Sequence, residues 1–416
     1  MQETGILAWL SAVPDSPPAK RAAVPKRPRC QLPSPTMSDN DTAESRKSLA
    51  GSLPQRSESS TSYSGRGGRA SPTKNLALLQ TSHVIGQQSL TGEKQRPKRL
   101  DDLVSLIKDD RIGMGILTQP DLDSIRVYSE EHPEERVLLS DLLNTRRLID
   151  TTGERTHLGA MPPIADLVEI WREANICEVN SHSEAAWNSE VHSPLLKAAL
   201  RYCVVNQSGD TRLVKIAHTN ITTAQITKSY SPYLLGTKHE KRVDFCFYLR
   251  AKSRPTEDAL SSAAQTSASS QCSINHTDYI ALLNCPISLS IETKRTGEDW
   301  KAGLEQMSVW LAAHWKRLNE LVASDPEQAN VEGDDQVMFL PAIIVQGHTW
   351  ILVAATQGRL LPNGGRETVI WTQIPIGSTE GLQGICQIIT VLQRLAAWST
   401  DTYWPWFANA VLNISA

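Results

Sequence analysis

The sequence lacks the signatures of several large protein classes. Its seven cysteines are scattered and include no Cys-x-x-Cys pair, which argues against a disulfide framework and against a zinc site. No apolar run approaches the roughly 18–20 residues of a membrane span. The opening GILAWLSAV follows Glu3 rather than a basic segment, so it makes a poor signal peptide. We therefore expect an intracellular protein, nuclear or cytoplasmic, without a membrane partner.

Three motifs of well-known enzyme classes are also missing. The chain has no glycine-rich phosphate loop, no Gly-x-Ser-x-Gly nucleophile motif and no convincing Cys–His pair. The sequence therefore shows no motif of a nucleotide-binding phosphate loop, a serine hydrolase or a cysteine hydrolase, and the acidic residues remain as the candidates for a catalytic site.

Charge is distributed unevenly along the chain. Residues 1–100 contain 15 Lys or Arg and 7 Asp or Glu, whereas residues 101–416 contain 27 and 38. Ser, Pro, Gly and charged residues dominate the stretch from about residue 11, so we predict a basic, mostly disordered tail over 1–98. Its clusters at 20–29 and 96–99 have the spacing of a nuclear import signal, and a solvated charge cluster explains them equally well. The acidic remainder is unusual for a tight nucleic-acid binder.

Residues 99–416 show the periodicity of one folded domain. Helical stripes predict a lead-in over 99–180, followed by a core over about 181–400. The core elements that the pattern predicts are a helix at 183–203 with an awkward Pro194, strands at 212–226, 241–251 and 286–294, a loop insertion at 251–279, a long helix at 300–323, a hairpin at 339–356 that turns near Gly347, and a helix at 380–398. This order predicts an α/β (α+β) fold with one central mixed sheet flanked by helices.

The strand in NCPISLSIETKRTGEDW, residues 284–300, ends in two opposite charges. With period two, the isoleucines and leucine of this strand share one face, while small polar residues, Glu292 and Lys294 share the other. In the preceding strand, KRVDFCFYL, Asp244 lies opposite the aromatic face. A buried, unpaired carboxylate is costly, so Asp244 needs a cation or a metal. An exposed Glu292–Lys294 ion pair remains the simpler interpretation when that pair is taken alone.

Neighbouring strands would bring Asp244 and Glu292 together. Two carboxylates at that distance repel unless a divalent cation lies between them, and hard oxygen ligands suit Mg²⁺ or Mn²⁺. Lys294 points the same way as Glu292 and could orient an attacking water or stabilise charge on a phosphate. The sequence therefore predicts a metal-assisted phosphodiester hydrolysis site made of Asp244, Glu292 and Lys294.

These residues stand within words that resemble a known family. SPTKNL, EAAWNSEVH, RVDFCF, NHTDY, SIETK and EQMSVWLAAHW resemble the PD-(D/E)XK nuclease superfamily, and in particular fungal proteins with a PD-(D/E)XK nuclease-like domain, over roughly residues 71–400. The resemblance implies a restriction-endonuclease-like core of a helix, three strands, a helix and a further strand.

The resemblance also implies roles for individual residues. Asp244 and Glu292 would be metal ligands and Lys294 the catalytic lysine, while Glu190 would be an accessory acidic ligand and Gln306 a residue that positions substrate. Two departures bear on these roles. Trp310 stands where some relatives have Tyr four residues after the glutamine, and Val243 replaces the usual proline before the aspartate.

The function expected from the resemblance is that of a nuclease that uses Mg²⁺ (or Mn²⁺) and acts on nucleic acid, with DNA favoured over RNA. The alternative is a catalytically inactive protein of the same fold that serves as a protein- or nucleic-acid-interaction module. The acidic domain favours the alternative, and the complete set of Glu190, Asp244, Glu292 and Lys294 favours catalysis.

Overall fold

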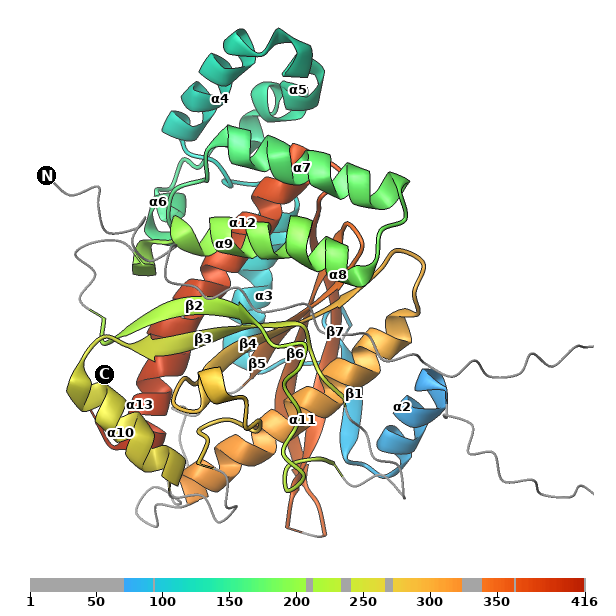
Figure 1. Cartoon of the computed structure of the whole chain (residues 1–416), viewed down its shortest axis with the longest axis vertical. Helices are drawn as coiled ribbons and strands as arrows, with labels where there is room; N and C mark the ends of the chain where they lie inside the picture. Colours follow the sequence, from blue (N-terminus) through green and yellow to red (C-terminus); the bar gives the residue numbers. More distant parts are fainter. Residues whose placement is uncertain are drawn as a thin grey trace, which may run out of the picture. The chain divides into compact units, whose positions relative to one another are not determined.

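A computed structural model gives the fold of the protein (Figure 1). It describes residues 71–92, 94–206, 212–232, 241–265, 272–323, 339–362 and 364–414. The predictions made for residues 1–70, including the import signal at 20–29, lie outside the described residues. Residues Gly67–Ala416 form one compact unit.

A seven-stranded mixed sheet forms the centre of this unit, as predicted. Its strands lie in the order β1-β7-β6-β5-β4-β3-β2. Two of the six pairings, β1 with β7 and β4 with β5, are parallel, and the other four are antiparallel. The strands are β1 (Ile85–Ser89), β2 (Val214–Asn220), β3 (Phe245–Ala251), β4 (Ile287–Lys294), β5 (Leu340–Gln346), β6 (Thr349–Leu360) and β7 (Arg366–Ser378).

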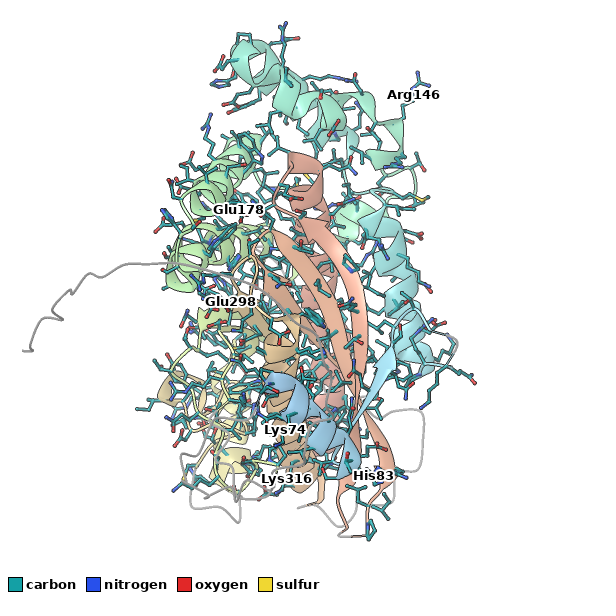
Figure 2. The ribbon with its side chains drawn as sticks, turned by 90° about the vertical axis from the view of Figure 1, so that its right-hand side faces the viewer. Lys74, His83, Arg146, Glu178, Glu298 and Lys316 are labelled. Atoms are coloured by element: carbon teal, nitrogen blue, oxygen red, sulfur yellow. The ribbon has the colours of Figure 1, made fainter. Side chains whose placement is uncertain are left out.

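Helices cover both faces of the sheet (Figures 1 and 2). On one face, α11 (Trp300–Ala323) crosses β4 to β7 and contacts α2 (Pro72–Thr81). On the other face, α12 (Leu382–Trp398) packs on β7 and contacts α3 (Lys98–Arg111) and α9 (Ser193–Arg201). Both long helices were predicted because their apolar residues recur at helical spacing. The sheet is therefore a middle layer, as in other α/β proteins with a buried sheet.

The remaining helices include a helical lead-in between α3 and β2. None of the described helices is long and apolar enough to cross a membrane. The α-helices are α4 (Gln119–Glu131), α5 (Arg136–Asn144), α6 (Glu154–Leu158), α7 (Ile164–Val179), α8 (Glu184–Trp187), α10 (Arg254–Gln265) and α13 (Trp404–Leu412). The π-helical turns are η3 (Asn188–His192) and η6 (Ser399–Tyr403), and the 3-10 turns are η1 (Pro133–Glu135), η2 (Arg146–Leu148), η4 (Val204–Asn206) and η5 (Ile280–Leu282).

The helix predicted at 183–203 is built from three segments that include a π-helical turn. The turn at Asn188–His192 directly precedes α9, and Pro194 falls at the start of α9. Proline has no backbone N–H and clashes with the preceding turn of a regular helix. The wider π turn is a recurrent way to place an extra residue in a helix, often at a functional site. The proline therefore marks a change of helical pitch rather than a break.

The tail predicted to be disordered through residue 98 is ordered in its last part. Residues 72–81 form α2 and residues 85–89 form β1, and Leu79, Ile85 and Leu90 are buried. Ser71 caps α2 by accepting a hydrogen bond from the backbone of Lys74. Periodicity did not indicate β1, because IGQQS has no alternating apolar pattern; its parallel pairing with β7 supplies the backbone partners.

The loop predicted at 251–279 is in part a helix. It joins the adjacent strands β3 and β4, as expected, but α10 occupies residues 254–265. Thr256, Leu260 and Ala264 form its buried stripe, at a spacing of four. The Ser and Ala content suggested a loop, whereas alanine is the best helix former and the short stripe is enough to anchor the helix.

Leu260→Ala is expected to lower the free energy of unfolding by about 2–3 kcal/mol, because Leu260 is only 1% exposed and its removal leaves a cavity. Urea denaturation measures the change. Ser262→Ala, on the solvent side of the same helix, is the matched control and is expected to have little effect. Equal midpoints for wild type and Leu260→Ala would show that α10 contributes no stability.

Candidate active site

The register of β3 and β4 places Asp244 opposite Glu292. Phe245 pairs with Ile291 in this antiparallel pair, so the preceding residue on one strand meets the following residue on the other. The backbone N–H of Asp244 donates to the carbonyl of Ile291 at 3.0 Å, which continues the ladder to this point. The predicted neighbourhood of these two strands is therefore confirmed.

The Asp244 side chain is fixed by Thr293, the middle residue of the Glu-Thr-Lys sequence. Asp244 is 4% exposed, and its Oδ2 accepts hydrogen bonds from the backbone N–H and the hydroxyl of Thr293, both at 2.8 Å. Burial raises the pKa of the Asp244 carboxyl, although these hydrogen bonds and the charge of Lys294 oppose the shift. Asp244 is thus held in one orientation.

Glu292 and Lys294 form a buried ion pair rather than the exposed pair of the simpler interpretation. Glu292 is 1% exposed, and the Lys294 ammonium donates to its Oε1 at 2.5 Å. Burial, and then the charge of Asp244, raise the pKa of Glu292 well above its usual value. Burial lowers the pKa of Lys294, but the charges of Glu292 and Glu184 outweigh that effect and leave the pKa raised.

A glycine in α11 allows this pair to lie directly under the helix. A Cβ atom at Gly303 would stand 3.6 Å from the Lys294 Cγ, 3.8 Å from the Glu292 Cγ and 3.3 Å from a methyl carbon of Ile344. The stems of Glu292 and Lys294 therefore pack against the helix backbone, which restricts their rotamers.

Glu184, at the start of α8, is a third carboxylate of the site that the sequence analysis missed. The Lys294 ammonium donates to its Oε2 at 3.3 Å. Burial raises its pKa, and the charge of Asp244 adds to the shift. The sequence offered one signal for Glu184, because Ser183 is a typical helix-capping residue and makes Glu184 the first residue of α8. The resemblance instead indicated Glu190, six residues further along the chain.

A cavity of about 350 Å³ opens beside these residues. Glu184 and Asp244 lie in its wall together with small polar side chains, namely Asn188, Ser189, Ser193, Asn220 and Thr222. Among the described residues that line it, none is Lys or Arg. Two further acids, Glu178 and Glu298, lie on the same side of the molecule in Figure 2. Glu178 accepts a hydrogen bond from Thr296, and Glu298 is paired with Arg295 at 2.9 Å.

Glu190 and Gln306 do not join this group. Glu190 is exposed, and its carboxylate accepts a hydrogen bond from Ser189, whereas the Lys294 ammonium donates to Glu292 and Glu184. Gln306 donates to the backbone carbonyl of Arg242, two residues before Asp244, so it supports the strand rather than facing the cavity. Trp310 is buried and donates to the Ser290 hydroxyl at 2.9 Å, which makes it a core residue.

The oxygen ligands of the site suit a hard divalent cation. The three carboxylates of Glu184, Asp244 and Glu292 face one ammonium, and a cation of charge two balances the difference. Among the described residues, no three His, Cys, Asp or Glu side chains are arranged to hold a metal ion. A cation here would take Asp244 and Glu292 as ligands and complete its shell with water or phosphate oxygens, which is the usual mode of Mg²⁺.

The fold and the acid-Thr-Lys ending of a central strand define the class of nuclease-like α/β proteins. The chain belongs to the PD-(D/E)XK nuclease superfamily, because the model of that superfamily matches residues 134–404. Nucleases of this superfamily typically use divalent metal ions. No curated protein matches the chain, and no solved structure does. The match begins at residue 134, so α2, β1, α3 and α4 precede the family region.

Thr293→Val is expected to lower the free energy of unfolding by about 1–2 kcal/mol, because it removes one of the two hydrogen bonds to a buried carboxylate while keeping the side-chain shape. Thermal or urea denaturation gives the difference. Thr219→Val on β2, whose hydroxyl makes only a weak 3.4 Å contact with a backbone carbonyl, serves as the control. A loss no larger than that of the control would contradict the proposed support of Asp244.

Proposed function

We propose that this protein hydrolyses phosphodiester bonds of nucleic acid at the site formed by Asp244, Glu292 and Lys294. The observation that carries the proposal is that Asp244 and Glu292 are buried, that Glu292 is paired with the largely buried ammonium of Lys294 at the end of β4, and that Asp244 lines a cavity. Buried charges with perturbed pKa values are concentrated at functional sites. Membership of the nuclease superfamily supports the same conclusion.

Each residue has a distinct part in the proposed chemistry. Asp244 and Glu292 would hold Mg²⁺ or Mn²⁺, which when bound supplies Lewis-acid stabilisation of charge on the phosphate. Thr293 orients Asp244, and Gly303 lets α11 fix the stems of Glu292 and Lys294. Lys294 orients the attacking water and stabilises the developing negative charge. Glu184, in the wall of the cavity, pairs with the Lys294 ammonium at 3.3 Å and helps to hold it in place.

A second function is favoured by the charge around the cavity. The described residues that line the cavity include two acids, Glu184 and Asp244, and no Lys or Arg. A nuclease usually presents basic side chains to the phosphate backbone. A catalytically inactive protein that keeps the fold and binds a protein or nucleic-acid partner accounts for this acidic cavity wall. The buried Lys294–Glu292 pair has no function in that account beyond structure, and for this reason we prefer catalysis.

Cleavage assays distinguish the two functions. Full-length protein is incubated with labelled single- and double-stranded DNA and with RNA, in Mg²⁺, in Mn²⁺ and in EDTA. We expect cleavage only with metal, with DNA cut in preference to RNA, and none by Asp244→Asn. The pair Glu184→Gln and Glu190→Gln tests the placement of the third acid: the first is expected to slow cleavage and the second to leave it unchanged. Metal-independent products, or equal activity of Asp244→Asn, would refute the proposal.

Two finer assignments belong to the same proposal. The similarity of the quoted words to fungal nuclease-like proteins supports a fungal source. The basic cluster at 20–29 supports action in the nucleus, where DNA is the substrate.

A further inference from the structure

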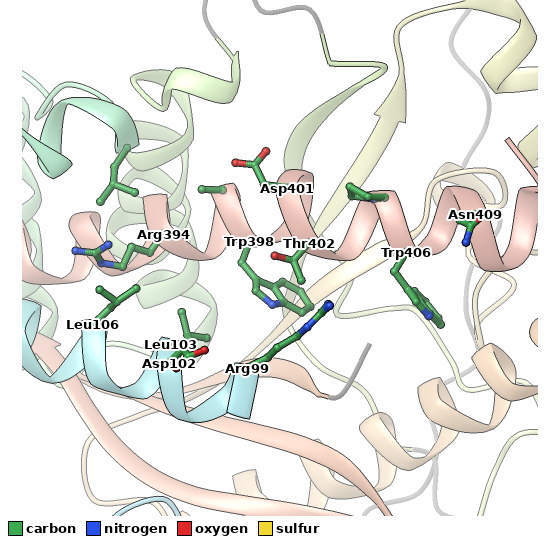
Figure 3. Close-up of a pocket in the computed structure, with 13 residues that line it drawn as sticks. Arg99, Asp102, Leu103, Leu106, Arg394, Trp398, Asp401, Thr402, Trp406 and Asn409 are labelled. Carbon is green, nitrogen blue, oxygen red and sulfur yellow. The ribbon is translucent and has the colours of Figure 1, made fainter. Parts of the chain in front are cut away.

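A second cavity, of about 720 Å³, lies between α3 and the junction of α12 with α13 (Figure 3). None of its lining residues belongs to the candidate active site. Its volume falls in the range of pockets that bind small organic ligands. Apolar side chains from both sides, including Leu103, Leu106 and Pro405, line it together with a few polar groups.

Arg99 is the lining cation whose charge remains available. Arg394 is paired with the buried Asp110 at 2.6 Å, and two acidic lining residues are also paired, Asp102 with Lys98 at 2.8 Å and Asp401 with Arg212 at 2.7 Å. Arg99 makes no hydrogen bond or ion pair within the part of the chain that the structure describes. The cavity therefore offers one uncompensated positive charge.

The three basic residues of the cluster at 96–99 have different surroundings in the structure. Arg96 is bound to Asp101 and to the carbonyl of Leu90, and Lys98 is paired with Asp102. These contacts fix the beginning of α3. Arg99, on the second residue of that helix, instead points toward Trp398 in the cavity (Figure 3).

Two tryptophans provide flat apolar walls beside Arg99. Trp398 is packed against Phe339 and Tyr403, with ring centroids 5.1 and 5.7 Å apart. Trp406 is half-buried and its ring centroid lies 5.9 Å from that of Tyr403. Because this aromatic cluster holds both indoles, a ligand ring could bind without first ordering them.

A planar ring joined to an anionic group fits these features together. We propose that the cavity binds a nucleotide unit, with the base against Trp406 and the phosphate on Arg99. Aromatic side chains bind nucleobases of any sequence by stacking, and arginine binds phosphate through two parallel hydrogen bonds. An acidic peptide is the less suitable ligand, because each of its residues carries a backbone N–H and C=O that need partners. Among the described lining residues, Thr402 and Asn409 are the two uncharged polar side chains, apart from the tryptophans, that could supply them. This site is separate from the proposed hydrolytic site and does not depend on it.

Calorimetric titration of full-length protein with adenosine 5′-monophosphate tests the proposal. EDTA is present throughout, so that metal-dependent binding at Asp244 and Glu292 does not contribute. We expect binding, weakened about tenfold or more in Arg99→Gln and in Trp406→Ala. Trp406→Phe is expected to retain most of the affinity. Lys108→Gln removes the same charge from an exposed position on α3 and is expected to bind as the wild type does.

Further ligands identify what is recognised. Wild type is expected to bind adenosine more weakly than the nucleotide, because adenosine has no phosphate for Arg99. For the same reason, Arg99→Gln is expected to bind adenosine as tightly as wild type does. A six-residue oligodeoxyadenylate that binds more tightly than the mononucleotide supports a single strand as the source; one that does not supports a free nucleotide. Three results would overturn the proposal: no binding at millimolar nucleotide, inorganic phosphate binding as tightly as the nucleotide, or an acidic peptide binding where the nucleotide does not.

Discussion

Replacing Lys294 with methionine is expected to slow nucleic-acid cleavage by about 10²–10⁴-fold while leaving Mg²⁺ affinity intact or higher. Methionine keeps the length and packing of the stem beneath Gly303 but removes the ammonium. In the structure that ammonium donates a hydrogen bond to Glu292 Oε1 at 2.5 Å, so it would compete with a metal ion for the same carboxylate. The variant is therefore expected to lose cleavage, while its Glu292 carboxylate becomes more accessible to Mg²⁺.

Single-turnover cleavage and calorimetric Mg²⁺ titration separate these two effects. Lys301→Met, at an exposed position near the start of α11, controls for the loss of one positive charge in the same region and is expected to keep the wild-type rate. If Lys294→Met lost metal binding together with activity, Lys294 would be a structural support for Glu292 rather than a catalytic residue.

Glu292→Gln is expected to reverse the order of stability of wild type and variant when metal is added. Burial, and then the charge of Asp244, hold the pKa of Glu292 in the folded protein well above the usual value that the unfolded chain has. Between these two values the folded state binds more protons than the unfolded state, so wild-type stability falls as pH rises through this interval. Glutamine does not titrate, and the metal-free variant is therefore expected to be more stable than wild type at pH 8.

Mg²⁺ is expected to stabilise wild type alone. A cation that binds the folded state contributes about 2.7 kcal/mol at one hundred times its Kd, and Glu292→Gln has lost a ligand. Thermal unfolding at pH 5 and pH 8, with and without Mg²⁺, measures both effects. Glu190→Gln, outside the cavity, is expected to follow wild type throughout. If the variant were less stable than wild type at pH 8 without metal, the attraction between Glu292 and Lys294 would outweigh the burial of Glu292 and its repulsion by Asp244, which would contradict the prediction.

Local sequence pattern predicted the parts of the fold that position the site. Period two identified β4 and the segment after Asp244 as strands, although the polar face of β4 proved as buried as its apolar face. That the two strands are neighbours was a separate expectation, and their antiparallel pairing confirms it. Helical periodicity likewise identified α11 and α12. The convergence of Asp244, Glu292 and Lys294 was predicted on the condition that these two strands are neighbours, and the resemblance to the nuclease superfamily supported it.

Partners distant in sequence determined what was missed. β1 is a polar segment that becomes a strand only by pairing with β7 almost 300 residues later. Glu184 reaches the site because α8 lies beside the end of β4, which no spacing within either element indicates. Glu190 was chosen by resemblance alone, and the π-helical turn that contains it leaves its side chain exposed.

The position of a bound cation tests the central claim most directly. Crystals grown with Mn²⁺ and a non-hydrolysable oligonucleotide analogue allow the ion to be located by its anomalous scattering. The account predicts a peak coordinated by carboxylate oxygens of both Asp244 and Glu292, with Lys294 moved from Glu292 toward the phosphate. An Mn²⁺ peak elsewhere, or an intact Lys294–Glu292 ion pair in a crystal of protein that cleaves nucleic acid, would contradict it.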